Sequence, residues 1–171
     1  MTVSSLLRTG AVALALTTTT AGGTVLLTAG AGSAENVKGD NRAFTAPLSG
    51  ENEVDSLGSG GVGDPDGAGN AVVKLNDATG ELCFKITARD ASTIVAAHIH
   101  EAGAGENGLI VQDLYSAISN DQTTVGTQTL SGCVPVAADL LAEIRDEPAD
   151  YYFNVHTTQF RAGAIRAQLA K

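Results

Sequence analysis

Short segments of alternating apolar and polar residues, separated by turns, make up most of the chain after about residue 42. The clearest pair is Ala71–Leu75 and Glu81–Thr87, joined by a five-residue turn from Asn76 to Gly80. Apolar residues that recur at every second position are typical of strands. The turn is rich in Asn, Asp, Thr and Gly, which favours a β-hairpin. Further strands are expected at Arg42–Leu48, Ile94–His100, Leu109–Leu114, 123–130, Tyr151–Thr157 and Ala164–Leu169. Strands that follow one another through short turns indicate an all-β sandwich or barrel.

One segment has a helical rather than a strand-like pattern. In Ala137–Arg145 the apolar residues Leu140, Leu141 and Ile144 are spaced to form one stripe of a helix. Pro148 follows, and proline cannot continue a helix. We therefore expect one short helix among the strands.

The N-terminal segment through residue 34 has the composition of a secretory signal peptide. Arg8 supplies a positive charge, apolar stretches follow at 11–16 and 25–27, and small residues precede cleavage after Ala34 or after Ala31. Threonines and glycines between 17 and 23 interrupt the roughly 20 apolar residues that a membrane-spanning helix needs. The expected organisation is therefore a signal peptide at 1–34, a flexible N-terminus at 35–41 and one domain at 42–171. We expect a secreted, extracellular protein with no membrane attachment after cleavage.

The net charge of the expected mature domain limits the classes of partner that it can bind. The chain carries a formal net charge of −9, and removal of Arg8 with the signal peptide makes it −10. An acidic domain without a cluster of lysine and arginine is poorly suited to nucleic acid or to anionic lipid. We expect neither as a partner.

Cys83 and Cys133 are the only cysteines, an even number in a chain that we expect to be exported. We predict a structural disulfide, since a redox pair or a thiolate metal site would be expected to show a CxxC spacing. Cys83 lies within an alternating segment and Cys133 follows a Ser-Gly turn. The bridge is therefore expected to join a strand to a loop, on the side away from Leu82, Phe84 and Ile86.

All three histidines fall in two strand-like segments. His98 and His100 share one face of the first segment, whereas Ala97 and Ile99 point to the other. His156 lies in the second segment. If the two strands are neighbours, three imidazoles meet on one surface.

The segments around these histidines carry a family resemblance. The runs are Ala97-His98-Ile99-His100, Gly103-Ala104-Gly105, Asn107-Gly108, Tyr151-Tyr152-Phe153-Asn154-Val155-His156-Thr157 and Gly163-Ala164-Ile165-Arg166-Ala167-Gln168-Leu169. Together and in this order they resemble the CHRD domain, which was named from chordin and is common in secreted bacterial proteins. The resemblance implies an all-β, Greek-key, immunoglobulin-like sandwich or barrel, and it implies no established biochemical activity.

Imidazole is a common ligand of copper and zinc, so His98, His100 and His156 are candidate metal ligands. Glu101, Glu106 or Asp113 could supply a fourth ligand or orient a ring. The alternatives are another small ligand, or a hydrogen-bonded imidazole network that needs no ion. A copper-zinc dismutase site is not expected, because it needs more histidines than the chain has.

No catalytic residue is expected, because the sequence contains no nucleophile elbow, phosphate loop or dinucleotide motif. Arg166 is expected to have a structural role, on a carboxylate or stacked on Tyr151 or Tyr152.

Two functions remain open. The first is a secreted CHRD-domain binding or interaction module without catalytic activity, which contacts an extracellular protein or small ligand through the Gly103–Gly108 loop and the sheet face beside it. The alternative is a copper- or zinc-binding β-domain that uses the three histidines.

Overall fold

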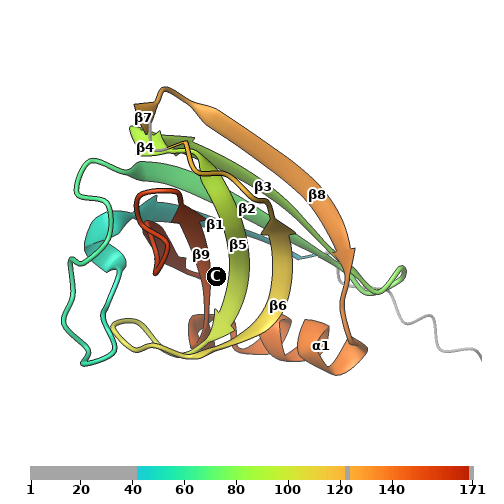
Figure 1. Ribbon diagram of the computed structural model, residues 1–171. Helices are drawn as coiled ribbons and strands as arrows, with labels where there is room; N and C mark the ends of the chain where they lie inside the picture. Colours follow the sequence, from blue (N-terminus) through green and yellow to red (C-terminus); the bar gives the residue numbers. More distant parts are fainter. Residues whose placement is uncertain (1–41, 122–123, 170–171) are drawn as a thin grey trace, which may run out of the picture. The chain divides into compact units, whose positions relative to one another are not determined.

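The computed structural model describes residues 42–121 and 124–169. Within these ranges, eight strands form one antiparallel sheet in the order β6-β5-β9-β10-β1-β2-β3-β8 (Figure 1). The strands are β1 (Ala43–Ser49), β2 (Ala68–Asn76), β3 (Glu81–Arg89), β5 (Ile94–Glu101), β6 (Leu109–Ser116), β8 (Gln128–Pro135), β9 (Tyr151–Thr157) and β10 (Ile165–Gln168). Two short strands, β4 (Ala91–Ser92) and β7 (Thr124–Val125), pair separately. The helical elements are η1 (Gly50–Asn52), α1 (Ala138–Asp146) and η2 (Pro148–Asp150).

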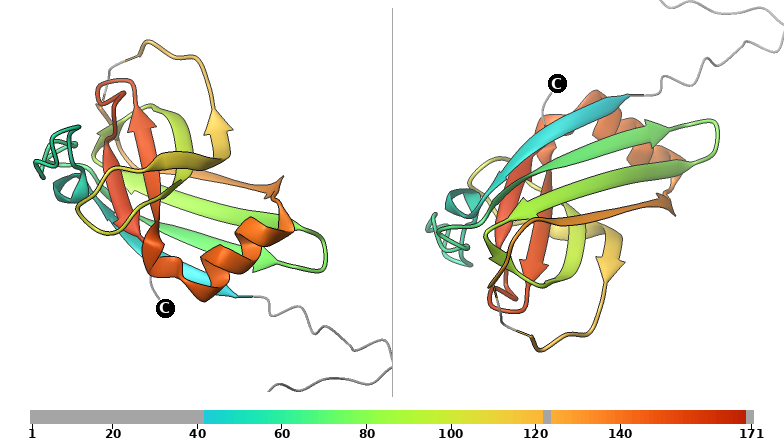
Figure 2. Two further views of the ribbon diagram at one scale, coloured as in Figure 1. Left: turned by 90° about the horizontal axis from the view of Figure 1, so that it is seen from below. Right: turned by 90° about the horizontal axis from the view of Figure 1, so that it is seen from above.

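The eight-stranded sheet curves until it is nearly closed into a barrel (Figures 1 and 2). Its edge strands, β6 and β8, come into contact. The all-β prediction with one short α-helix is confirmed for the described part of the chain. The Greek-key and immunoglobulin-like details are not confirmed, because the strand pairing gives one large sheet rather than two packed sheets.

The core fills the concave side of the sheet because the strands alternate. In the β2–β3 hairpin, Val73 pairs with Phe84 and Leu75 with Leu82, and all four side chains are buried. Two side chains of α1, Leu141 and Ile144, are also buried in this core. Helix α1 thereby packs against one end of the sheet, as Figure 1 shows below the strands.

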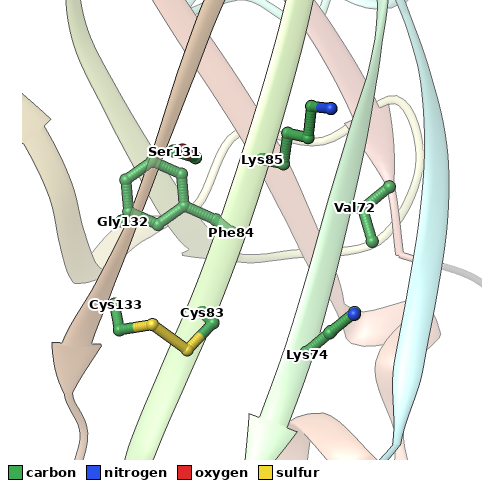
Figure 3. A pocket seen from close by; sticks show the side chains of 8 residues that line it. All are labelled: Val72, Lys74, Cys83, Phe84, Lys85, Ser131, Gly132 and Cys133. Atoms are coloured by element: carbon green, nitrogen blue, oxygen red, sulfur yellow. A yellow bond between two sulfur atoms is a disulfide. The ribbon is translucent and has the colours of Figure 1, made fainter.

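The disulfide prediction is confirmed in its pairing and corrected in its placement. Cys83 and Cys133 are bonded, and they lie directly opposite each other on β3 and β8 (Figure 3). Cys133 is therefore in a strand and not in a loop, because β8 continues through Gly132 to Pro135. As expected, the bridge lies on the face opposite Leu82 and Ile86, which point into the core.

The proposed signal peptide at 1–34 and flexible N-terminus at 35–41 lie outside the described residues, so their assignment stays a prediction. In the part of the chain that the structure describes, no helix has both the length and the apolar character to span a membrane.

Candidate functional site

The three histidines lie together on the outer face of β5 and β9, as the alternation predicts. Ala97 and Ile99 of β5 point into the core and are fully buried, so His98 and His100 point outward. Strand β9 is hydrogen-bonded beside β5, and it places His156 on the same face. The β5–β6 pairing is irregular on either side of His98 and Ile99. Such irregularities often re-aim side chains next to sites.

The imidazole nitrogens are close enough to share one ion. One ring nitrogen from each histidine lies within 4.8 Å of the corresponding nitrogens of the other two. Nδ1 of His98 is 3.1 Å from Nε2 of His156. Zinc–nitrogen bonds of about 2.0–2.1 Å place two ligands of a tetrahedral ion roughly 3.3 Å apart. The cluster therefore needs only small side-chain shifts to surround a metal ion.

Backbone carbonyls fix which nitrogens of two rings face the cluster. Nδ1 of His100 lies 3.1 Å from the carbonyl oxygen of Gly108, and Nδ1 of His156 lies 3.0 Å from that of Arg161. A carbonyl only accepts, so in each ring Nδ1 carries the proton and Nε2 keeps a lone pair. Histidine ligands of metals are typically oriented by such a hydrogen bond on the other ring nitrogen.

His98 has two possible partners, and they require different tautomers. Its Nε2 is 3.5 Å from Oδ1 of Asp113 on β6, whereas its Nδ1 faces Nε2 of His156. When Nε2–H points to Asp113, the Nδ1 lone pair faces the lone pair of His156, and a cation between them removes this repulsion. Without a cation, Nδ1–H can donate to His156 instead. Asp113 is the one candidate carboxylate that contacts a ring in the described structure.

All three rings are held in the neutral form that binds metals. Burial, followed by the neighbouring His156 and His100, lowers the pKa of His98 to about 4. Burial also lowers the pKa values of His100 and His156. Neutral imidazoles keep the lone pairs free near neutral pH.

Tyr152 and the loop from Ala102 to Gly108 close one side of the cluster. The Tyr152 ring stacks on His100 with ring centroids 4.7 Å apart, and the guanidinium of Arg166 lies 3.4 Å from the Tyr152 centroid. Arg166 also donates to the Gly103 carbonyl, and the Tyr152 hydroxyl accepts from the Gly108 amide. Arg166 thus contacts Tyr152, one of its expected partners, and the purely structural role expected for it stays a prediction.

Sequence reasoning missed a buried polar pair on the same face. Nδ2 of Asn154 donates to Oε2 of Glu53 at 3.3 Å, and the two residues are 4% and 2% exposed. Burial raises the pKa of Glu53 to about 7, although Arg166 and Asn154 act in the opposite direction. Asn154 could have been found from its outward position in β9. Nothing in the local sequence marks Glu53, because a long-range contact buries it.

One family model matches most of the chain. The family model for the CHRD domain matches residues 44–169. This chain belongs to the CHRD family. The CHRD match covers β5, β9 and β10, which carry His98, His100, His156 and Arg166. Neither a search of curated proteins nor a search of solved structures gave a significant match.

Proposed function

We propose that this CHRD domain is an extracellular binding module whose ligand is one transition-metal ion, zinc or copper, held by His98, His100 and His156. The observation that carries the proposal is the convergence of three neutral imidazoles. Each has its other nitrogen within 3.5 Å of an oxygen that can accept a hydrogen bond. Imidazole suits both zinc and copper, and three protein ligands leave a further position open.

A metal-free hydrogen-bond network accounts for the cluster less completely. Such a network would pair Nδ1 of His98 with Nε2 of His156. It would leave Nε2 of His100 buried and without a hydrogen-bond partner, in a side chain that is only 8% exposed. Leaving a buried acceptor unsatisfied costs about 1–3 kcal/mol. A metal ion gives this nitrogen a partner.

Thermal unfolding with added metal tests this proposal. A ligand that binds only the folded protein stabilises it by about 2.7 kcal/mol when its free concentration is 100 times Kd. We expect zinc or copper to raise the Tm of the wild-type protein, and this rise to disappear in His98→Ala and in His156→Ala. Gln112→Ala on β6 is the matched control and should keep the full rise. An equal rise in the wild type and in both histidine variants would contradict the site.

A protein-contact function has separate support from exposed apolar residues next to the Gly103–Gly108 loop. Leu109 and Ile110 follow this loop and are 82% and 50% exposed. Asn107 ties the loop to the backbone carbonyls of Val54 and Asp55. Replacing Leu109 and Ile110 by serine should abolish capture of extracellular partners without lowering the Tm. Unchanged capture by the folded variant would contradict this second function.

The disulfide and the proposed signal peptide together support secretion, since disulfides persist in oxidising compartments. Mass spectrometry of the protein from culture medium should give an N-terminus at Glu35 or Gly32. Recovery of the uncleaved chain only from inside the cell would contradict secretion.

A further inference from the structure

Three buried side-chain atoms in the described residues have no hydrogen-bond partner, and all three bear lone pairs. They are Nε2 of His100, Oδ1 of Asn154 and Oε1 of Glu53, from side chains that are at most 8% exposed. Buried polar groups are usually satisfied by protein, water or an ion. A metal ion would give Nε2 of His100 a partner. Oδ1 of Asn154 and Oε1 of Glu53 would still lack a hydrogen-bond donor.

Asn154 lies beside the histidines on the outer face of the sheet. It is paired directly with His98 across β5 and β9, and it precedes His156 by two residues on the same face. Side chains in such opposed positions have Cβ atoms about 4.5–5.5 Å apart. Its Nδ2 atom is committed to Glu53, so Oδ1 is the atom left for another partner.

We propose that Asn154 selects the non-protein ligand at the metal, through an Oδ1 atom that accepts a hydrogen bond from a bound water molecule. Glu53 is the positioning residue, because its carboxylate holds the amide in this orientation. The inference rests on the proposed three-histidine metal site. The chemical class that fits is a small ligand that donates a hydrogen bond, such as water, rather than an anion that only accepts.

The charges around the site give the same preference. Three neutral imidazoles leave the full charge of a divalent ion, which by itself attracts anions. At pH 8, where Glu53 is ionised, its carboxylate and the amide oxygen of Asn154 oppose an incoming anion, because both present lone pairs. The positive Arg166 interacts electrostatically with Glu53 and with His100. Because Arg166 is unchanged in the variants below, its attraction for anions does not contribute to the differences between them.

Titration of the cobalt-loaded protein with azide at pH 8 tests this selection. Co²⁺ is used in place of zinc because it gives a visible absorption spectrum that reports the binding of azide. In Asn154→Leu the acceptor is lost at similar volume, so we expect azide to bind about tenfold more tightly, the effect of one hydrogen bond of about 1.4 kcal/mol. Asn154→Asp keeps an acceptor and should bind azide no more tightly than the wild type. Cobalt affinity should stay within threefold in Asn154→Leu.

Glu53→Gln provides a second variant in case Asn154→Leu does not fold, as judged by circular dichroism. Without the carboxylate, we expect azide to bind several-fold more tightly than in the wild type. Equal azide affinity in the wild type and in the folded variants would overturn the inference while leaving the metal site standing. A tenfold or greater loss of cobalt affinity in Asn154→Leu would also overturn it, because Asn154 would then itself be a metal ligand. Failure of the wild-type protein to bind cobalt, zinc or copper would instead refute the proposed function.

Discussion

Replacing Glu53 by glutamine should make the protein more stable than the wild type at pH 8, but not at pH 4.5. Glu53 is 2% exposed, and burial raises its pKa from the usual 4.5 to about 7. Between these two values the folded protein binds more protons than the unfolded protein does. The favourable contribution of neutral Glu53 is therefore fully present below pH 4.5, and it is lost as the pH rises through 7.

The change in pKa sets the size of the effect. A pKa that moves from 4.5 to about 7 corresponds to about 3 kcal/mol. Glutamine does not titrate, and the histidines and the other carboxylates are common to both proteins. The free energy of unfolding of Glu53→Gln relative to the wild type should therefore increase by about 3 kcal/mol between pH 4.5 and pH 8.

Urea denaturation of both proteins, with a chelator present, measures this difference at each pH. Glu101→Gln, at an exposed position on β5, is the matched control and should show a change of less than about 0.5 kcal/mol. A stability difference between Glu53→Gln and the wild type that stays constant from pH 4.5 to 8 would refute a buried, neutral Glu53.

Three further perturbations test other parts of the structure. Replacing both Cys83 and Cys133 by alanine opens a bridge between residues 50 apart, and chain entropy predicts a loss of about 4 kcal/mol in urea denaturation; an unchanged midpoint would contradict a structural disulfide. In NMR titrations of the metal-free protein, His98 should titrate near pH 4. Because the unfolded protein takes up this proton near pH 6.5, the contribution of neutral His98 to the free energy of unfolding is present above pH 6.5 and is lost as the pH falls toward 4. A His98 pKa near 6.5 would argue against its burial. Gly163→Ala should lower stability by more than about 1 kcal/mol, because its φ is 148° and an added Cβ would lie 2.6 Å from Oε2 of Glu53. Gly126→Ala, where a Cβ has open space, is the control, and equal losses in both variants would contradict the close approach.

Local patterns were sufficient to predict most of the strands and the faces of the histidines. The expected strand at 123–130 was misplaced, because the structure has the short β7 there and a β8 that runs from Gln128 to Pro135. The alternation in Ala97–His100 indicates which side chains face the core, and it persists in the structure although the pairing of β5 with β6 is irregular there. The same reasoning predicted the hairpin at Asn76–Gly80, where the Asn76 side chain accepts from the amides of Ala78 and Thr79. These features depend only on neighbouring residues.

Features that depend on distant contacts could not be predicted in the same way. The sequence does not specify that β9 pairs with β5, although this pairing brings His156 to His98 over a separation of 58 residues. Glu53 and Asn154 are 101 residues apart, and no local pattern at Glu53 indicates that it meets Asn154. The disulfide was misplaced for a similar reason, since the glycine at 132 favours a turn whereas pairing with β3 keeps that residue in a strand.

Elemental analysis after titration with copper and zinc tests the metal site most directly. The wild-type protein should be compared with a variant in which His98, His100 and His156 are all replaced by alanine, after circular dichroism has shown that both are folded. The account predicts one equivalent of metal in the wild type and none in the variant. Equal metal content in the two folded proteins, whether negligible or stoichiometric, would contradict it.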